Sequence, residues 1–458
     1  MKRIDLAAGQ QLQESDLTRQ GVLPPGALEA AADIIAQVRA GGDAAVRELT
    51  LRFDGACPDA FRVPDEVVRG ALDLVDPQFV AAITKAADQI RSFHEHERGQ
   101  SWTTYRPDGT VLGVKVTPVA SAGIYVPGGR AQYPSTVLMD CIPAKVAGVR
   151  RIVMVTPPQK DGTLSAYTLA AAALAGVDEV YAVGGAQAIA ALAYGTESIP
   201  RVAKVVGPGN AYVAAAKKLV SGDVGIDMVA GPSEVCVLAD AQANPAVVAA
   251  DLMAQAEHDP QATCYLVTPA AELVEPVLAA LGAFCAQSPR EQITRASLDD
   301  NGVVVVTDGM DDALAAVNVI APEHLELHTV DAWDLLGKVE NAGAIFVGPW
   351  SSEPLGDYVA GPDHTLPTGG TATFSNPLGV YDFEKRSSVI GYTREGMLAD
   401  ADATQVMAQA EGLWAHALSV GVRRRVAQDG IDDPARLTVD ATATAWPHEL
   451  AAPGRVTL

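Results

Sequence analysis

The sequence predicts an α/β protein built on two parallel β-sheets, with an N-terminal arm and a small C-terminal helical domain. Two observations favour this fold class. Short apolar strands alternate with helical stretches from about residue 135, and the same alternation resumes at residue 234. In addition, a chain of 458 residues is too long for one hydrophobic core, so two or three domains are expected.

The composition is that of a globular protein with an acidic surface. Apolar residues make up 48% of the chain, charged residues make up 19%, and the formal net charge is −23. This charge argues against nucleic-acid binding, which needs a basic face. No stretch approaches the ~20 consecutive apolar residues of a membrane span. The N-terminal MKRIDLAAGQ lacks the apolar core of a signal peptide. We therefore expect a cytoplasmic protein with no nucleic-acid or membrane partner.

Cysteine usage agrees with a reducing compartment. The five cysteines are scattered and have no CxxC spacing, and they are Cys57, Cys141, Cys236, Cys264 and Cys285. An odd number without such spacing argues against a disulfide framework and against a thiolate zinc site.

Helices are predicted for most of the first hundred residues, after an arm that covers residues 1–25. The arm ends in the loop-like VLPPG. The next stretch, to about residue 52, has helical periodicity and is split at the pair Gly41-Gly42. Two further helices, 64–74 and 77–97, each begin near a proline.

The region after residue 110 turns β-rich and then alternates between helix and strand. The alternating stretches from residue 135 are STVLMDCIPAKVAGV, RIVMVTPP, TLSAYTLAAAALAG, EVYAVGG, AQAIAALAYG, KVVGPGN and AYVAAAKKLV. Such a pattern predicts a parallel sheet wrapped by helices, which binds ligands beyond the carboxyl ends of its strands. Glycine-rich loops fall at three strand ends: YVPGG at 125–129, GGAQ at 184–187 and GPGN at 207–210. The GxGxxG fingerprint is absent, so the loops indicate only the ligand side of a sheet, and each alone is an ordinary turn.

A second α/β region begins with the strand EVCVL. A helix follows it, with Asn244 at the N-cap and Pro245 in the first position. Later strands are expected at CYLVT, GVVVVT, APEHLEL and GAIFVG. The long polar loop 349–379 has the length of a functional loop. Residues 400–426 are predicted to be helical, and little order is expected from about residue 428.

Side chains that could bind a metal lie in four separate segments. Gln255 and His258 are three residues apart at the end of a helix, so they share one face, although such a pair is more often a solvated edge. Asp357 lies in the long loop, and Glu411 and His416 lie five residues apart in the C-terminal helical stretch. A zinc site of nitrogen and oxygen ligands without thiolates would be formed by Gln255, His258, Asp357 and His416.

Glu323 and His324 are candidates for proton transfer. They adjoin in the segment APEHLEL, and adjacent side chains on an extended segment diverge, so the two could serve separate proton-transfer steps. The role of His364 is left open. Two other features receive structural interpretations: the run HEHE at 94–97 is read as a solvated helix face, and His328 as a satisfied edge residue.

Long strings of the sequence resemble the histidinol dehydrogenase family. They are GIYVPGGRAQYPSTVLM, GGAQAIAALAYGTE, VGPGNAYVAAAKK, DMVAGPSEV, DLMAQAEHDP, NVIAPEHLEL, GDYVAGPDHTLPTGGTATF and AEGLWAHAL. They span most of residues 25–425 in the family's order, and a chance match of so many strings is negligible. The resemblance implies a zinc- and NAD-dependent oxidoreductase that completes histidine biosynthesis. The last part of the chain extends past the family core and receives no functional reading.

The resemblance also implies roles for single positions. The positions that match the family's zinc ligands are Gln255, His258, Asp357 and His416, and they would hold one Zn²⁺ per subunit. Those that match the acid–base pair are Glu323 and His324. Those that match histidinol contacts are the four zinc ligands together with Ser233, His324 and Glu411. Those that match NAD contacts are Tyr125, Gln187 and Asn210.

Four segments are expected on this basis, with both α/β domains Rossmann-like. They are an N-terminal arm (1–25), a discontinuous substrate and metal domain (26–124 and 234–376), an NAD-binding domain (125–233), and a C-terminal helical domain with the tail (377–458). The family is a homodimer whose C-terminal domain reaches over the partner's site. The resemblance therefore implies that Glu411 and His416 act in trans.

The implied reaction is a four-electron oxidation of L-histidinol to L-histidine through L-histidinaldehyde, with two NAD. A neutral imidazole suits the removal of the alcohol proton, which we assign to His324. Glu323 is assigned to the water that attacks the aldehyde, and zinc to orienting the substrate.

Two other classes of function remain open. A zinc hydrolase on the same fold would use Glu323 to activate water without NAD, and the glycine-rich strand ends would then have no purpose. A catalytically silent binding protein would be expected to have lost Glu323 or His324, and both are present.

Overall fold

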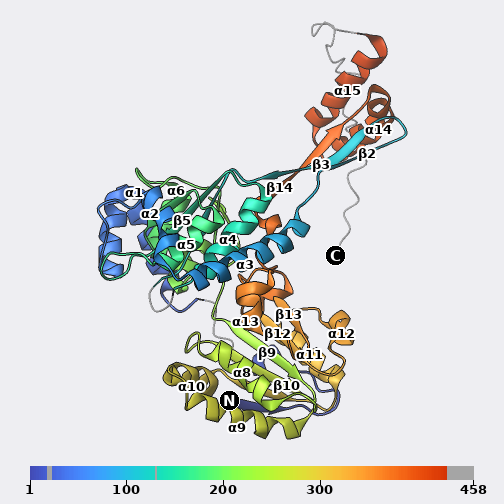
Figure 1. The fold of residues 1–458 in the computed structure, drawn as a ribbon. Coiled ribbons are helices and arrows are strands. Elements are labelled where there is room, and N and C mark those ends of the chain that lie inside the picture. Colours follow the sequence, from blue (N-terminus) through green and yellow to red (C-terminus); the bar gives the residue numbers. More distant parts are fainter. Residues whose placement is uncertain (18–22, 129–131, 431–458) are drawn as a thin grey trace. The chain divides into compact units, whose positions relative to one another are not determined.

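The structure of the protein is a computed structural model, and it describes residues 1–17, 23–128 and 132–430 (Figure 1). Backbone contacts divide the chain into two units. The first unit contains Met1–Gly99 and Pro118–Glu384, and the second contains Gln100–Thr117 and Lys385–Leu458. Two parallel sheets lie in the first unit. The predicted α/β class with two Rossmann-like sheets is therefore confirmed.

The first parallel sheet has the strand order β6-β5-β4-β7-β8. Its strands are β4 (Ser121–Tyr125), β5 (Arg151–Thr156), β6 (Glu179–Ala182), β7 (Lys204–Val206) and β8 (Gly225–Ile226). The connecting helices are α4 (Pro134–Ala147), α5 (Ala166–Ala175), α6 (Gly185–Tyr194) and α7 (Ala211–Val220). The order reverses between β4 and β7, as in doubly wound folds. Ile152 and Val153 of β5 belong to different hydrophobic cores. Both faces of the sheet are thus covered, which explains the continuous apolar runs of its strands.

The helices of the first hundred residues pack against this sheet's own helices. They are α1 (Ala27–Asp54), α2 (Asp65–Gly70), η2 (Ala71–Leu74), α3 (Pro77–His94) and η3 (Glu95–Glu97). α1 packs on α6 and α7, α3 packs on α4, and the predicted break in α1 is a kink at Gly42 with φ 52°. The expected grouping of 26–124 with 234–376 differs from this packing. Periodicity marks the apolar face of a helix but does not tell which sheet that face will cover.

His94 corrects the interpretation of the run 94–97 as a solvated face. Glu95 and His96 are exposed, but His94 is fully buried. Its Nδ1 lies 2.7 Å from Oε2 of Glu97, and the same oxygen accepts a hydrogen bond from the Val380 N–H. The partner that buries this end of the helix is therefore far away in the sequence.

The second parallel sheet has the strand order β1-β11-β10-β9-β12-β13. Its strands are β1 (Lys2–Asp5), β9 (Glu234–Ala239), β10 (Thr263–Thr268), β11 (Val303–Val306), β12 (His324–His328) and β13 (Ala344–Val347). Its helices are α8 (Pro245–Ala256), α9 (Ala271–Cys285), α10 (Glu291–Asp300), α11 (Met310–Ile320), α12 (Ala332–Leu335) and η4 (Leu336–Lys338). The order reverses between β9 and β12, so β12 is an interior strand. The interpretation of His328 as an edge residue is therefore wrong, because it is 3% exposed.

The N-terminal arm is part of this second sheet. β1 pairs in parallel with β11, with Lys2 opposite Val303. A short helix, η1 (Glu14–Asp16), follows, and three leucines of the arm join the core of the sheet, namely Leu6, Leu12 and Leu17. Sequence proximity could not reveal this pairing, since the two strands are separated by most of the first unit.

The long loop after β13 contains short helices, namely α13 (Glu353–Leu355), η5 (Gly356–Ala360), η6 (Thr371–Thr373) and η7 (Val380–Phe383). The second unit follows it. Its elements are β2 (Trp102–Tyr105), β3 (Val111–Pro118), β14 (Glu384–Gly391), α14 (Arg394–Ala410) and α15 (Trp414–Asp429). The two helices pack on each other, and the strands form a sheet in the order β14-β3-β2. The stretch predicted to be helical, 400–426, forms two helices, and the unit also includes β2 and nearly all of β3. The tail was predicted from about residue 428; α15 continues to Asp429, and the rest of the tail, from residue 431, lies outside the described residues.

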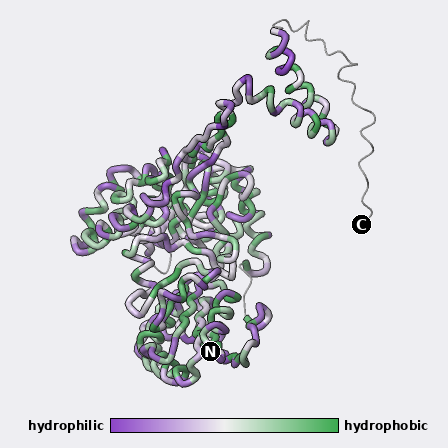
Figure 2. The backbone as a smooth tube through the Cα atoms, turned by 90° about the vertical axis from the view of Figure 1, so that its right-hand side faces the viewer, coloured by the Kyte–Doolittle hydropathy of each residue, from purple (hydrophilic) through white to green (hydrophobic). Residues whose placement is uncertain are grey.

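Hydrophilic and hydrophobic residues are interspersed along the chain (Figure 2). In the part of the chain that the structure describes, no helix is both long and apolar enough to cross a membrane.

Candidate active site and metal centre

Glu323 and His324 lie at the amino end of β12, beside the amino end of β9. Nδ1 of His324 is 3.0 Å from the Glu234 carbonyl oxygen, and Oε2 of Glu323 accepts a hydrogen bond of 2.8 Å from the Glu234 N–H. One residue of β9 therefore holds both side chains. Both are buried, with 6% of Glu323 and 3% of His324 exposed. This end of the sheet is opposite to the carboxyl ends at which doubly wound sheets ordinarily bind ligands.

The contact with a carbonyl determines the tautomer of His324. A carbonyl oxygen only accepts, so Nδ1 carries the hydrogen, and in the neutral ring Nε2 holds a free electron pair. Nε2 is buried and has no hydrogen-bond partner among the described residues, and it lies 3.8 Å from Oδ1 of Asp357. Burial lowers the pKa of His324, but the carboxylates of Glu323 and Asp357 outweigh it and raise the pKa to about 10. A ring with this pKa is protonated at neutral pH, so Nε2 can accept a proton only when a cation bound at the neighbouring carboxylates lowers the pKa.

For Glu323, burial is the dominant influence on the pKa. Burial raises its pKa to about 7, although the neighbouring His324 and the Glu234 N–H act to lower it. Its Oε2 lies 3.6 Å from Nδ1 of His324, beyond hydrogen-bond distance. As predicted, the two side chains do not hydrogen-bond to each other. A carboxyl group with a pKa near neutrality can both accept and release a proton.

Three side chains beside His324 could hold a metal ion. Ligand atoms of His258, Glu353 and Asp357 all lie within 4.8 Å of one another. Gln255 is completely buried, and its Oε1 has no hydrogen-bond partner among the described residues. Its Nε2 lies 3.4 Å from Nδ1 of His258. An orphaned amide oxygen beside an imidazole and two carboxylates is a donor set that suits zinc.

The electrostatics of this cluster are those of a site for a cation. Burial raises the pKa of Glu353 to about 8. Burial also acts to raise the pKa of Asp357, but the surrounding imidazoles outweigh it and hold that pKa below its ordinary value. Desolvation lowers the pKa of His258, which keeps its ring neutral and able to coordinate.

Glu353 was not among the predicted site residues. It is four residues before Asp357, the spacing that brings two carboxylates onto one face of a helix, and this is the signal that could have found it. It lies in α13, and Asp357 lies in η5 directly after it.

His364, whose role the sequence leaves open, supports the same segment. Its Nδ1 is 3.0 Å from the Asp357 carbonyl oxygen, and its Nε2 is 3.3 Å from Oγ1 of Thr136. Both ring nitrogens are thus engaged, and His364 holds the backbone of Asp357.

A separate cavity of about 1180 Å³ opens at the carboxyl ends of β4 and β5. Tyr125, Gln187 and Asn210 all line it, so the three predicted NAD contacts lie around one space. Gln187 is 1% exposed, and both atoms of its amide lack a hydrogen-bond partner among the described residues. The hydroxyl of Tyr125 accepts a hydrogen bond of 3.1 Å from the Gly185 N–H. Oδ1 of Asn210 caps α7 by accepting from two backbone N–H groups.

This cavity has the features of a nucleotide site. It lies at the point where the strand order reverses, and the N-termini of α6 and α7 border it. A Cβ on Gly128 would lie 2.7 Å from the ring of Pro157, so the loop is tightly packed there. The amide of Gln187, which none of the described residues engages, supplies both a donor and an acceptor for a bound ligand.

Comparison with known proteins agrees with this geometry. The sequence model described as histidinol dehydrogenase matches residues 19–424. The histidinol dehydrogenase of Bacillus licheniformis is 53% identical over 392 residues, which cover 86% of this chain and 92% of that protein. The histidinol dehydrogenase of Halalkalibacterium halodurans is 51% identical over 390 residues, which cover 85% and 92%. The chain belongs to the histidinol dehydrogenase family.

A solved structure shows the same fold. The crystal structure of histidinol dehydrogenase from Elizabethkingia anophelis superposes with a TM-score of 0.87 and 34% identity, and it covers 92% of this chain and 98% of that chain. The histidinol dehydrogenase family places the protein among the oxidoreductases of histidine biosynthesis.

Three further predicted site residues of this histidinol dehydrogenase family member are Ser233, Glu411 and His416. Ser233 directly precedes β9, and its carbonyl accepts from the Thr263 N–H. Glu411 follows α14, and His416 lies in the first turn of α15; both are exposed and belong to the second unit. Their part in the site therefore stays a prediction.

Proposed function

We propose that the protein is an NAD- and zinc-dependent histidinol dehydrogenase that oxidises L-histidinol to L-histidine through L-histidinaldehyde. The observation that supports this most directly is the orientation of His324. Its Nδ1 is anchored by a carbonyl, and its buried Nε2, which has no hydrogen-bond partner among the described residues, lies 3.8 Å from Oδ1 of the candidate metal ligand Asp357. A base in that position can take the proton of an alcohol bound at the cluster.

The chain's own residues account for the proton transfers. In the first oxidation His324 takes the hydroxyl proton through Nε2. In the second, Glu323 takes a proton from the water that adds to the aldehyde, and the resulting diol is oxidised in the same way. Each oxidation removes one hydride and one proton, so the balance is two NADH per histidinol. Burial of both groups excludes bulk water from the reacting atoms.

Gln255, His258, Asp357 and His416 are proposed to hold one Zn²⁺ per subunit, with Glu353 adjacent. Bound zinc would orient the substrate, and bound NAD would accept the hydride. Ser233 and Glu411 are proposed to fix the substrate. The proposed NAD site is the cavity lined by Tyr125, Gln187 and Asn210.

Further parts of the proposal concern the assembly. We propose a cytoplasmic homodimer in which the second unit of one protomer supplies Glu411 and His416 to its partner's site. A dimer formed from an inactive His416→Ala chain and an inactive His324→Asn chain would then regain one working site. Activity that reappears on mixing the two variants supports the arrangement in trans, and its absence in verified mixed dimers contradicts it.

The test of the function is the number of NADH formed per L-histidinol consumed, measured before chelation, after chelation and after zinc is restored. Two NADH, lost on chelation and regained with zinc, is the expected result. One NADH with accumulating aldehyde would remove the role given to Glu323. Hydrolysis without NADH would favour the zinc hydrolase, for which the large cavity around Gln187 has no use.

A further inference from the structure

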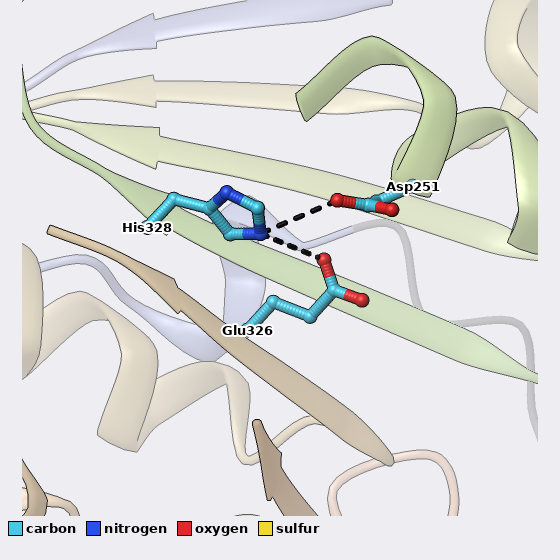
Figure 3. Close-up of side chains that lie close together, drawn as sticks. All are labelled: Asp251, Glu326 and His328. Atoms are coloured by element: carbon cyan, nitrogen blue, oxygen red, sulfur yellow. Dashed lines mark hydrogen bonds and ion pairs between the residues drawn. The ribbon is translucent and has the colours of Figure 1, made fainter. Parts of the chain in front are cut away.

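Asp251, Glu326 and His328 form a buried group of charged side chains beside the segments that carry the candidate metal ligands. His324, Glu326 and His328 alternate along β12 and therefore share one face of the strand. Nε2 of His328 lies 3.2 Å from Oε2 of Glu326 and 3.3 Å from Oδ2 of Asp251 (Figure 3). Glu326 is fully buried, His328 is 3% exposed and Asp251 is 7% exposed. We call Asp251, Glu326 and His328 the buried triad.

The triad joins two segments that carry candidate metal ligands to the strand that begins at the candidate base, His324. Asp251 lies on α8, one helical turn before Gln255. Glu326 and His328 lie on β12, which begins at His324. Oε1 of Glu326 accepts a hydrogen bond of 2.8 Å from the N–H of Glu353, at the start of the segment that contains Asp357.

The charges explain why the arrangement needs the histidine. Two carboxylates buried this close to each other repel, and an imidazolium between them compensates both. Burial lowers the pKa of His328, but the neighbouring carboxylates of Asp251 and Glu326 outweigh it and raise the pKa to about 9. A neutral, apolar side chain at position 328 would leave the carboxylates unpaired. Glu326 would then move or take up a proton, and its bond to Glu353 would weaken.

We propose that the buried triad positions the 353–357 segment against α8 and β12, and thereby sets the affinity of the metal centre. The proposal rests on the proposed function, because it takes Gln255, His258 and Asp357 as metal ligands. The three members are positioning residues, which act through the segment that carries Asp357. Loss of an outer hydrogen-bonding partner of a metal ligand typically weakens metal binding by about 10–100-fold.

The test measures the zinc dissociation constant of the full-length apoprotein by competition with a chromogenic chelator. We expect His328→Phe to weaken zinc binding by at least about tenfold. The KM for NAD should stay within about twofold, since the cofactor cavity lies on the other sheet. A matched control is His94→Phe. His94 is also a fully buried histidine paired with a carboxylate, but its hydrogen bonds lead to Val380. This control should lower the melting temperature while leaving zinc affinity unchanged.

A second pair of variants keeps the proposal testable if His328→Phe does not fold. Glu326→Gln retains an oxygen that can accept from the Glu353 N–H, whereas Glu326→Leu does not. Zinc affinity should therefore be closer to the original protein in Glu326→Gln than in Glu326→Leu. Equal affinities in the two variants would contradict the proposal.

Other outcomes would also overturn it. Unchanged zinc affinity in a folded His328→Phe protein would remove the positioning role, and an equal loss in His94→Phe would point to general destabilisation. The three ligand atoms of the triad also lie close enough together to hold a cation. Two zinc ions per subunit, one of them lost in His328→Phe, would replace the proposal by a second metal site. A failure of the proposed function would instead appear as no NADH from the original protein, and it leaves the affinity comparison intact.

Discussion

Nε2 of His324 and Oδ1 of Asp357 lie 3.8 Å apart, and the imidazole is held from behind by the Glu234 carbonyl. The spacing joins the candidate base to a candidate metal ligand without a direct hydrogen bond between them. A substrate held at Asp357 would therefore meet Nε2 directly. Because no direct hydrogen bond joins the two side chains, a mutation of one residue does not remove a hydrogen-bonding partner of the other.

His324→Asn removes Nε2 but keeps an amide nitrogen near the position of Nδ1, which can still donate to the Glu234 carbonyl. We expect kcat for histidinol oxidation to fall by about 10²–10⁴-fold, because the proton acceptor is lost. Zinc content should be unchanged. Steady-state NADH formation and metal analysis test this. A variant that retains more than about a tenth of kcat would exclude His324 as the base.

Glu323→Gln preserves an oxygen that can accept from the Glu234 N–H, so the fold should be retained. The amide cannot take a proton from water, and oxidation of added histidinaldehyde should slow by about 10²–10⁴-fold. Oxidation of histidinol to the aldehyde should be affected much less. Separate assays with the alcohol and the aldehyde measure the two steps. Equal losses in both assays would contradict the assignment.

The raised pKa of Asp54 predicts that the stability of the protein depends on pH. Burial at the edge of the large cavity raises its pKa from 3.8 to about 6. The folded state therefore binds the proton more tightly than the unfolded state. The contribution of Asp54 to stability is fully present below pH 3.8 and is lost as the pH rises through 6.

Asp54→Asn removes this dependence. Above pH 6 the variant should be more stable than the original apoprotein by about 1 kcal/mol, a value reduced to allow for the partial exposure of the side chain. Near pH 4 the difference should shrink. Urea unfolding at both pH values provides the measurement. A difference that is constant with pH would show that Asp54 titrates normally.

Gly207 follows β7 with φ 111°, and a Cβ there would overlap the Tyr125 carbonyl oxygen. Gly207→Ala should destabilise the protein by more than the ~1–3 kcal/mol that such a φ costs by itself. Gly222→Ala is the matched control, since Gly222 has φ 104° and a Cβ added there would have no described atom within 4 Å. Urea unfolding compares the two variants. Equal destabilisation would mean that the overlap is relieved without cost.

Much of the fold could be predicted because its signals are local. Helical periodicity identified α1 with its break at Gly42, and Asn244 caps α8 as expected. Strand-end glycines predicted the ligand side of the first sheet, where Tyr125, Gln187 and Asn210 now line one cavity. These features depend on residues that are neighbours in the chain, or on strings long enough to identify the family.

The sequence by itself determined the fold class, the family and the candidate residues Glu323, His324, His258 and Asp357. Only the tertiary structure decided that β1 joins β11, that α1 packs on α6 and α7, and that His328 lies buried between Asp251 and Glu326. It also added Glu353 to the candidate metal ligands. The reason is physical: hydrophobic periodicity specifies which face of an element is buried, but the partner of that face is selected by packing between segments far apart in the chain.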